Sequence, residues 1–510
     1  MNQKLALEIL LGGESALVTG AAGSGKTYLL NQFIRLAKHD GKHVSVTAST
    51  GIAATHLGGT TIHAWSGIGV RDHIDSRFVD HLSKGRREII EKTDVLVIDE
   101  ISMLHDYRLD MVDEICRLVR AQPDTPFGGI QVVMSGDFFQ LPPINRRDSG
   151  REGGFVTDSA AWRDLDPTVI YLGEQHRQDD EVLLDILNSL RRGDLRRHHA
   201  EKLLARVGTM PEDNRGLTEL HTMNVDVDRI NAERLATLEG DTVSYQSTHT
   251  GSANYVEALA RSVLAPEVLE LKLGALVMAV RNDSGRRYAN GSIGQVVAFE
   301  PDSDYPVVQF AGGREVTMQP ETWELRDGDK KRASITQIPL RLAYAITVHK
   351  SQGMTLDAAL IDLRKAFVEG MGYVALSRVR SLDTLYLHGI NQMALAVSEA
   401  AQAIDEQLRT RSASDSQKFD HLREQADKRD LKPPAKPKKS GGSTSWKEKI
   451  EKMRQTHPNA FKPWTAQDDE TLKTDFQHGE SIANLAKKLG RHNGSIRARL
   501  KKHFGEDVIG

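Results

Sequence analysis

The sequence predicts an α/β protein with two tandem α/β domains, a small β insertion in the second domain and a helical unit near the C-terminus. Three observations carry this prediction. Short apolar runs alternate with helical patterns along the N-terminal half, which is typical of strands in a mostly parallel sheet. A glycine-rich stretch of short apolar runs interrupts the second half, and helical periodicity returns after a Pro- and Lys-rich stretch. At roughly 150 residues per domain, the chain has room for all these parts.

The N-terminal domain is predicted over residues 1–165, with a small insertion at about 66–88. Its apolar runs are continuous and bounded by Gly or charged residues, as in strands buried on both faces. Such runs comprise residues 16–19, 44–47, 95–98 and 130–134 in this domain and 169–172 just beyond its predicted end, and a helical stretch at 27–39 follows the first run. Cys116 shares helical spacing with Val112, Ile115 and Val119, so we expect a buried core thiol.

The second domain is predicted over residues 166–265 and 339–405, where strand and helix patterns resume. Residues 266–338 interrupt it with closely spaced glycines and β-rich runs, which predicts a small β-barrel. Residues 406–445 are polar and then rich in Pro, Lys, Gly and Ser, a composition typical of flexible linkers. Residues 446–510 end the chain, with helical periodicity over 464–504.

The composition excludes several classes of protein. Apolar residues make up 39% and charged residues 27%, as in an ordinary globular chain. No run approaches the roughly 18 apolar residues of a membrane span, and we expect no signal peptide. A single cysteine excludes an internal disulfide and a cysteine-based zinc site, which favours a cytoplasmic location. The net charge of −3 divides into +8 for residues 431–510 (17 Lys and Arg against 9 Asp and Glu) and −11 for the rest, which indicates a polyanion partner for the tail.

A glycine-rich segment after the first predicted strand fits the pattern G-x-x-x-x-G-K-[ST]. It comprises Gly20, Ala21, Ala22, Gly23, Ser24, Gly25, Lys26 and Thr27. Such glycines let main-chain N–H groups wrap phosphates, and the N-terminus of the following helix adds positive charge. Lys26 is then placed to reach the β- and γ-phosphates and Thr27 to ligate Mg²⁺, so the expected cofactors are ATP and Mg²⁺. The alternative is a glycine-rich turn without a ligand.

Two carboxylates, Asp99 and Glu100, follow the predicted strand at 95–98. An aspartate at the C-terminal end of such a strand can reach Mg²⁺, and the adjacent Glu100 is placed to orient or deprotonate the attacking water. This pair indicates hydrolysis rather than binding alone. A solvated turn is the alternative for an Asp-Glu pair taken by itself.

Further segments resemble the motifs of superfamily 1B DNA helicases of the PIF type, with RecD-like and Dda-like helicases as near relatives. These segments are residues 47–54 with 58–63, 126–129 with 136–143, 176–178, 345–356 and 373–378. They lie in the family's order and spacing over about residues 1–390. The resemblance implies two RecA-like P-loop domains, an SH3-like barrel at 266–338, and the family's duplex-splitting wedge at 144–154.

The same resemblance implies roles at matching positions in the nucleotide site. Gln140 would sense the γ-phosphate, and Arg177 and Arg378 would be arginine fingers from the second α/β domain. A surface salt bridge is the alternative for either arginine. Gln3 is similar to a glutamine that reads adenine, with an unrelated terminal glutamine as the alternative. Gln352 and Gly353, within the segment 345–356, complete the expected nucleotide-binding set.

Contacts with single-stranded DNA are expected along a channel across the two domains. By resemblance, this channel is lined by Thr61, His63, Thr347, His349 and Lys350. Hydroxyl, imidazole and ammonium groups suit backbone phosphates and give little sequence specificity. For three aromatic residues in apolar surroundings we expect core packing, with stacking on bases as the alternative: Trp65, Phe138 and Phe139.

The C-terminal unit resembles a helix–turn–helix over residues 481–503. Its last helix carries Arg497 and Arg499, which suit a duplex groove or phosphates. A solvated basic helix or a protein-docking module is the alternative. Thr465 and Asp468 are spaced as in a capping box at the start of its first helix.

The resemblance implies an ATP-dependent DNA helicase that moves 5′→3′ on single-stranded DNA and unwinds tailed or forked duplexes. It would serve replication, recombination, repair or telomere and genome maintenance. An ATP-gated protein that grips or loads DNA without sustained unwinding is the alternative. A relaxase- or nuclease-linked motor is disfavoured, because no His/Asp set or tyrosine pair stands out in the sequence beyond these motifs. We expect a monomer without membrane contact, in the cytoplasm or at a bacterial nucleoid, with replication or repair proteins as further partners.

Overall fold

The computed structural model describes residues 1–504 with internal gaps. The gaps are residues 70, 76, 144–151, 176, 179, 212–216, 261–262, 284–286, 289, 301–302, 311–312, 328–329, 430–453 and 460–463. Most of the predicted wedge at 144–154, His176 of the segment 176–178, and the predicted linker from 430 to 445 lie outside the described residues. No helix in the described ranges is long and apolar enough to cross a membrane.

The first α/β domain is built on a six-stranded parallel sheet in the order β3-β2-β4-β5-β1-β6. The strands are β1 (Ala16–Gly20), β2 (Val44–Ala48), β3 (Thr60–Thr61), β4 (Val95–Asp99), β5 (Gln131–Gly136) and β6 (Thr168–Leu172). Every strand predicted in the N-terminal half is therefore confirmed. Strands β1, β4 and β5 are buried along their whole length, as their unbroken apolar runs require in a sheet covered on both faces.

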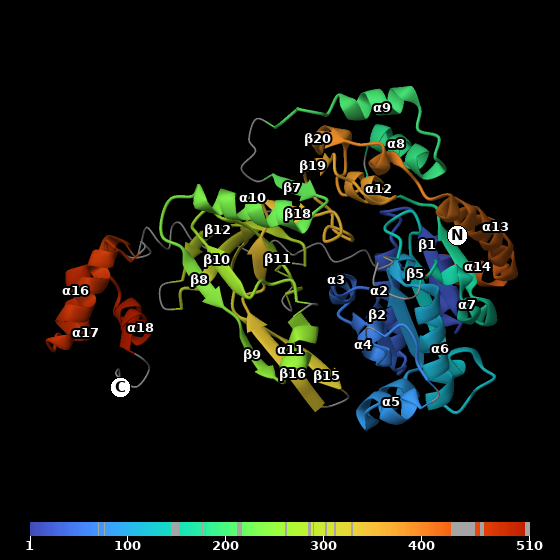
Figure 1. The fold of residues 1–510 in the computed structure, drawn as a ribbon, viewed down its shortest axis with the longest axis horizontal. Helices are drawn as coiled ribbons and strands as arrows, with labels where there is room; N and C mark the ends of the chain where they lie inside the picture. The colour runs from blue at the N-terminus through green and yellow to red at the C-terminus, as the bar shows by residue number, and fades with distance from the viewer. Residues whose placement is uncertain are drawn as a thin grey trace.

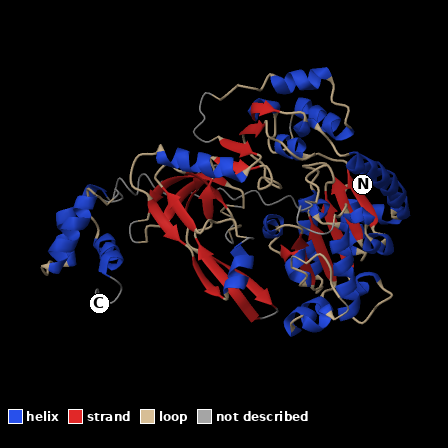
Figure 2. Cartoon of the chain, in the orientation of Figure 1, coloured by secondary structure: helices blue, strands red, loops and turns tan. Residues whose placement is uncertain are grey.

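Helices cover both faces of this sheet (Figure 2). They are α1 (Gln3–Leu11), α2 (Lys26–His39), α3 (Gly51–His56), α4 (Ile62–Ser66), α5 (Lys84–Lys92), α6 (Asp106–Val119) and α7 (Ala160–Leu165). Because side chains alternate along a strand, Val18 packs with α1 and α2 on one face, while Leu17 belongs to the core that includes α6 on the other. Cys116 is fully buried in α6, which confirms its predicted place in the core.

The predicted boundary between residues 165 and 166 is wrong, because β6 pairs with β1 in the first sheet. An apolar run of this kind fits any buried parallel strand, so its neighbours are decided by long-range pairing rather than by local pattern. The second domain has its own four-stranded parallel sheet in the order β18-β7-β19-β20. Its elements are α8 (Glu181–Arg192), α9 (Arg197–Leu204), β7 (Thr218–His221), α10 (Asn224–Ala236), β18 (Ala345–Thr347), β19 (Ala359–Leu363), α12 (Met371–Leu376) and β20 (Leu385–Ile390).

The predicted β insertion is confirmed, with wider limits than 266–338. Its main sheet is antiparallel, in the order β14-β13-β12-β11-β17, and lies between β7 and the C-terminal helices in Figure 1. Two further strand sets adjoin it, β15-β16-β9 and β10-β8. The elements are β8 (Val243–Gln246), β9 (Thr248–Gly251), α11 (Ala253–Ala260), β10 (Val268–Leu271), β11 (Leu276–Ala279), β12 (Ile293–Phe299), β13 (Pro306–Phe310), β14 (Glu315–Thr317), β15 (Glu321–Asp327), β16 (Lys330–Gln337) and β17 (Leu340–Leu342).

The predicted linker is wrong from residue 406 to 428, because helix α13 (Glu399–Lys418) and helix α14 (Arg423–Lys428) pack back on the first domain. Strand β6 is the edge of its sheet, and α13 supplies partners for its main chain: Val169 N donates to Asp415 Oδ2 at 2.9 Å and Tyr171 N donates to Ser412 Oγ at 3.0 Å. Because α13 contacts the edge strand through polar side chains, its sequence is polar even though one of its faces packs against β6.

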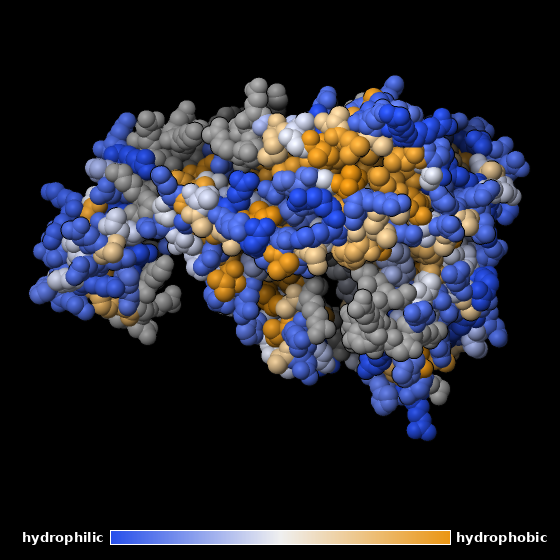
Figure 3. Space-filling model, turned by 45° about the horizontal axis from the view of Figure 1, so that its top comes forward, coloured by the Kyte–Doolittle hydropathy of each residue, from blue (hydrophilic) through white to orange (hydrophobic). Residues whose placement is uncertain are grey.

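Between residues 464 and 504, which the structure describes, the C-terminal unit has three helices, as predicted: α16 (Ala466–Gln477), α17 (Ile482–Leu489) and α18 (Asn493–Phe504). Its small core is formed by Leu472, Leu485, Leu489, Ile496 and Leu500. The predicted capping box is present, because Asp468 N donates to Thr465 Oγ1 at 3.0 Å and Thr465 N donates to Asp468 Oδ2 at 3.3 Å. The outer surface of this unit, at the left of Figure 3, is mostly hydrophilic.

Candidate nucleotide and DNA sites

The glycine-rich segment forms a tight loop between β1 and α2. Gly20 and Gly23 have φ angles of +144° and +89°, which side-chain-bearing residues rarely adopt. A Cβ atom at position 23 would also lie 2.6 Å from Arg177 Cβ, so a glycine is needed where the second domain's connection approaches the loop. Lys26 lies over the loop, with its Nζ donating to Gly20 O at 2.8 Å and to Ala21 O at 3.0 Å.

Asp99 and Glu100 lie at the C-terminal end of β4, facing this loop. Asp99 ends the strand and Glu100 adopts a left-handed φ of +51°. Burial, together with the mutual repulsion of the two carboxylates, raises the pKa of Glu100, and burial raises the pKa of Asp99. Burial in turn lowers the pKa of the Lys26 ammonium. Two desolvated carboxylates beside the exposed hydroxyl of Thr27 form an oxygen donor set that fits Mg²⁺.

A cavity of about 460 Å³ opens between the two α/β domains at this point. The predicted residues that line it are Ala22, Gly23, Gly25, Lys26, Thr27, Asp99, Glu100, Gln140, Arg177, Gln352, Gly353 and Arg378. Gly20, Ala21 and Ser24 belong to the loop but are not among the lining residues. Gln3 is likewise absent from the lining, but its Nε2 donates to Ser24 O at 3.4 Å, which places it directly beside the loop.

Both predicted arginine fingers are in the cavity wall. Arg378 is only 1% exposed, and its guanidinium donates to Val374 O, Ser351 O, Met354 O and Ser377 Oγ. Burial and the neighbouring positive charge of Arg177 lower the pKa of Arg378 to about 9. Arg177 donates to Ser377 O at 3.3 Å, and burial lowers its pKa as well. The alternative of a surface salt bridge is wrong for Arg378, because it is buried.

Two glutamines from different domains complete the wall. Gln352 Nε2 donates to Glu100 Oε2 at 3.0 Å, across the boundary between the domains. Gln140 follows β5, and its Oε1 is buried with no hydrogen-bond partner among the described residues. A buried acceptor of this kind is costly unless a ligand or water satisfies it. The cavity therefore fits a magnesium–nucleoside triphosphate. Its wall combines desolvated arginines, a lysine, the glycine-rich loop and a pair of carboxylates.

The residues expected to contact single-stranded DNA come from both α/β domains. Thr61 caps α4, with its Oγ1 accepting from Ala64 N at 3.2 Å, and His63 lies in the first turn of the same helix. Burial, followed by the nearby positive charge of Arg108, lowers the pKa of His63 to about 4, so its imidazole is neutral at pH 7. Figure 1 shows α3 and α4 on the side of the first domain that faces the inserted sheets.

Three further expected DNA residues follow β18 in the second domain. Thr347 is buried, and its Oγ1 accepts from Lys350 N at 3.3 Å, so its hydroxyl holds the turn. Lys350 Nζ donates to Asn224 Oδ1 at 3.0 Å. His349 lines the mouth of the cavity and stacks on Phe367 with ring centroids 6.1 Å apart. Phe367 is 59% exposed, an unusual position for a large aromatic side chain.

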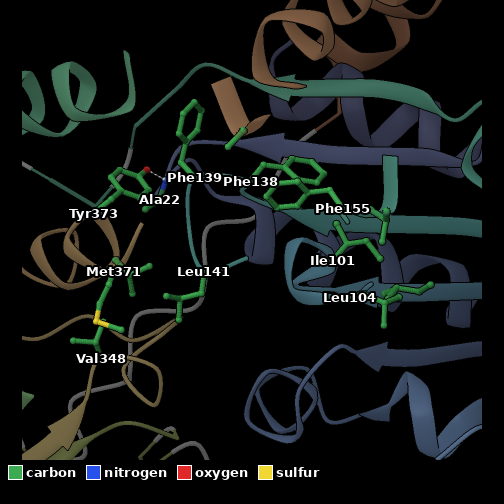
Figure 4. Close-up of a cluster of buried hydrophobic side chains, with 14 of the residues drawn as sticks. Ala22, Ile101, Leu104, Phe138, Phe139, Leu141, Phe155, Val348, Met371 and Tyr373 are labelled. Carbon is green, nitrogen blue, oxygen red and sulfur yellow. Dashed lines mark hydrogen bonds between the residues drawn. The ribbon is translucent and has the colours of Figure 1, made fainter. Parts of the chain in front are cut away.

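The three aromatic residues considered for base stacking lie in the core instead. Trp65, Phe138 and Phe139 are all buried, and Phe138 packs edge-on against Phe155 (Figure 4). The expected core packing is therefore confirmed for all three, and the alternative of base stacking is wrong.

The two arginines predicted on the last helix of the C-terminal unit differ in their surroundings. Arg499 donates to Asp469 Oδ1 at 2.7 Å and to Asp469 Oδ2 at 2.6 Å, and its guanidinium lies 5.4 Å from the centre of the Trp464 ring. Arg491 lies over the same ring at 4.2 Å. Arg499 is thus held by an internal ion pair, whereas Arg497 is exposed.

The structure also brings together a His/Asp cluster that the sequence analysis did not anticipate. Asp185, His198 and His199 lie close enough for one metal ion to bridge them. His199 Nδ1, however, accepts from Arg196 N at 3.1 Å, and its Nε2 lies 2.9 Å from Asp185 Oδ2. Nε2 must then carry the proton, so this histidine caps α9 and offers no lone pair to a metal.

Comparisons with known proteins agree with this geometry. The sequence profile of the PIF1-like helicases matches residues 5–195. The ATP-dependent DNA helicase Pif1 of Psychrobacter sp. (strain PRwf-1) is 40% identical over 484 residues, which cover 83% of this chain and 73% of that relative. The chain belongs to the PIF1-like helicase family. The resemblance seen in its motifs is thereby confirmed.

Solved structures of PIF1-like helicases show the same fold. The crystal structure of Pif1 helicase from Candida albicans matches with a TM-score of 0.70 and 33% identity, covering 80% of this chain and 99% of that one. The Pif1 helicase from Bacteroides in complex with ADP-AlF3 and ssDNA matches with a TM-score of 0.61 and 30% identity, covering 81% of this chain and 98% of that one. Two α/β domains with a β insertion are therefore the architecture of this family member.

Several residues of this PIF1-like helicase were missed by the sequence analysis. Arg380 lines the cavity as a third arginine, and its position two residues after Arg378 was a usable signal. Phe367 lies in a loop with no motif to mark it. The segment Pro126–Gly129, one of the segments that resemble the family's motifs, is absent from the cavity wall and forms a turn before β5 in which Phe127 and Gly128 are buried. Phe127 N donates to the carboxylate of Asp113 there, so the segment supports the fold.

Proposed function

We propose that this chain is an ATP-dependent DNA helicase that moves 5′→3′ along single-stranded DNA and unwinds tailed or forked duplexes. One observation carries the proposal: the cavity that fits a nucleoside triphosphate is shared between two domains, with main-chain amides on one side and guanidinium groups on the other. A ligand that contacts both walls stabilises the closed arrangement, and its hydrolysis releases it. Repeated closing and opening is the movement a translocating motor needs.

The first domain holds the nucleotide. The amides of the glycine-rich loop and the Lys26 ammonium bind the phosphates, for which Lys26 exchanges its present carbonyl partners Gly20 and Ala21. Thr27 and Asp99 are the residues that would hold Mg²⁺, which when bound neutralises charge on the phosphate oxygens. Gln3 reads the adenine, and its contact with the loop at Ser24 supports this role.

Hydrolysis uses residues from both domains. Glu100 orients the attacking water and accepts its proton, and Gln352 holds the Glu100 carboxylate. Gln140 contacts the γ-phosphate by donating from its amide NH2 group, while its buried, unpartnered amide oxygen accepts from the attacking water. Arg177 and Arg378 stabilise the charge that develops on the transferred phosphoryl group. An arginine in this role contributes roughly 10³–10⁵ to turnover in well-studied phosphoryl-transfer enzymes.

Single-stranded DNA is proposed to cross both domains beside the cavity. Thr61 and neutral His63 contact it from the first domain, and His349 and Lys350 from the second. Phe367, exposed and stacked on His349, provides a surface for a base, since base stacking tolerates any sequence. The Bacteroides relative solved with ssDNA supports DNA as the ligand.

The C-terminal unit is proposed to bind duplex DNA through α18. Its exposed Arg497 and the net positive charge of residues 431–510 support this role. We also propose that the protein acts as a monomer in a reducing compartment, for which its single, buried cysteine is the support.

Strand displacement tests the proposal directly. Purified protein with ATP and Mg²⁺ should displace the labelled strand of a 5′-tailed duplex and leave a 3′-tailed duplex intact. Glu100→Gln, which retains the side-chain volume, should still bind ATP and DNA but displace no strand. ATP-dependent binding without displacement of either substrate would favour the alternative, an ATP-gated loading protein.

A further inference from the structure

The phosphate-binding loop is tied to the second domain by one phenolic hydroxyl. Ala22 N, a main-chain amide of the loop, donates to Tyr373 Oη at 2.9 Å, although 351 positions separate the two residues. Figure 4 shows this bond where the second-domain residues Val348, Met371 and Tyr373 meet the first-domain core. Tyr373 lies in α12, and Arg378 follows the end of that helix.

The Tyr373 hydroxyl has every hydrogen-bonding capacity in use. It accepts from Ala22 N and from Arg191 Nη1 at 3.0 Å, and it donates to Asp137 Oδ2 at 3.1 Å. Tyr373 is 2% exposed, and burial raises the pKa of its hydroxyl to about 12. The hydroxyl is therefore neutral at pH 7, and its three partners fix its position completely.

Asp137 connects this hydroxyl to the turn that carries Gln140. Its carboxylate is buried and doubly bonded by Arg191 Nη1, at 2.8 and 2.9 Å. It also accepts from Phe139 N at 3.2 Å, while Gln140 N donates to Asp137 O at 3.0 Å. The turn that presents Gln140 to the cavity is thus built around the same carboxylate that Tyr373 contacts.

The start of α12 also touches this turn through its main chain. A Cβ atom at Gly370 would lie 2.6 Å from Gln140 O and 2.7 Å from Phe139 O, so the two segments are in direct contact. At the other end of the helix, Ser377 O accepts from Arg177 and Ser377 Oγ accepts from Arg378. One short helix therefore links the glycine-rich loop and the Gln140 turn to both arginines.

We propose that Tyr373 is a positioning residue. During ATP hydrolysis it keeps the glycine-rich loop, the Gln140 turn and the two arginines in fixed positions relative to one another. This inference rests on the proposed function. Ground-state ATP binding depends on the loop amides and Lys26, which remain when the hydroxyl is removed. The position of the arginines relative to the loop matters when charge develops on the phosphoryl group in the transition state. Loss of this alignment should therefore lower kcat more than it raises KM.

Tyr373→Phe tests the proposal, because it removes the hydroxyl and keeps the buried ring. The full chain should be measured for DNA-stimulated ATP hydrolysis, with kcat and KM for ATP determined separately. We expect kcat to fall about tenfold, the size of one lost hydrogen bond in the transition state, with KM and single-strand affinity changed less than about twofold. Tyr386→Phe in β20 makes the same change outside this network and should leave both constants unaltered.

Two results would overturn the proposal. An unaltered kcat in Tyr373→Phe would show that the hydroxyl only fills space, and a rise in KM alone would show that it acts in nucleotide binding. Thermal melting of each variant confirms that it is folded at the assay temperature. These failures are separate from a failure of the proposed function, which would appear as no ATP hydrolysis by the unaltered protein.

Discussion

Gln352 and Glu100 face each other across the domain boundary, with Gln352 Nε2 donating to Glu100 Oε2 at 3.0 Å. Glu100 belongs to the first domain and follows β4, whereas Gln352 follows β18 in the second. The carboxylate proposed to handle the attacking water is thus held by a residue of the second domain. Nucleotide hydrolysis and domain position are connected at this bond.

Changing Gln352 should slow hydrolysis in a graded way. Gln352→Ala removes the donor and leaves the Glu100 carboxylate without its orienting partner, so DNA-stimulated turnover should fall about tenfold. Gln352→Glu places a second carboxylate against Glu100 and should reduce turnover further, because the two charges repel. Steady-state ATPase assays rank the two variants, and equal turnover in both would contradict the electrostatic part of this account.

Lys26→Ala should abolish ATP hydrolysis and leave single-strand binding largely intact. The Lys26 ammonium donates to carbonyl oxygens of the nucleotide loop, while the proposed DNA residues lie on other elements. Lys38→Ala, at an exposed position near the end of the same helix, serves as the matched control. ATPase rates and fluorescence anisotropy with a labelled oligonucleotide check both parts. Wild-type turnover in Lys26→Ala would remove the glycine-rich loop from the active site.

The nucleotide site was largely predictable from sequence because its chemistry is local. Residues 20–27 carry their geometry in three closely spaced glycines, and Asp99 and Glu100 directly follow an apolar run. The bonds of Tyr373 were not predictable, because Ala22, Asp137 and Arg191 are far from it in the chain. The docking of α13 was missed for a related reason: its polar side chains bond the edge of β6, and polarity was taken as a sign of a linker.

The C-terminal helical unit should lose stability in acid through Asp469. Partial burial alone would raise the pKa of this carboxyl, but hydrogen bonds from Arg499 and His503 outweigh burial and lower the pKa to about 2. A carboxyl whose folded-state pKa is depressed stabilises the fold above its unfolded value of 3.8, and this contribution disappears as the pH falls toward 2. Amide hydrogen exchange in α16 and α18 of the full chain should therefore accelerate between about pH 4 and pH 2.

Asp469→Asn should give faster exchange already at pH 4.5 and a smaller change on acidification. Asp475→Asn provides the control, since Asp475 pairs with Lys488 in the same unit and lies outside the Asp469–Arg499 pair. If both variants showed the protection of the unaltered protein at pH 4.5, the Asp469–Arg499 pair would have no stabilising role.

Single-turnover ATP hydrolysis by Arg177→Ala at saturating single-stranded DNA tests the central claim most directly. The fold should survive, because Ser377 O, the acceptor of Arg177, also accepts from Gln178. If the triphosphate is held between the loop amides and the guanidinium groups of the other domain, ATP affinity should change only a few-fold while the hydrolysis step slows by roughly 10³. A hydrolysis step within a few-fold of the unaltered protein would contradict catalysis shared between the two domains.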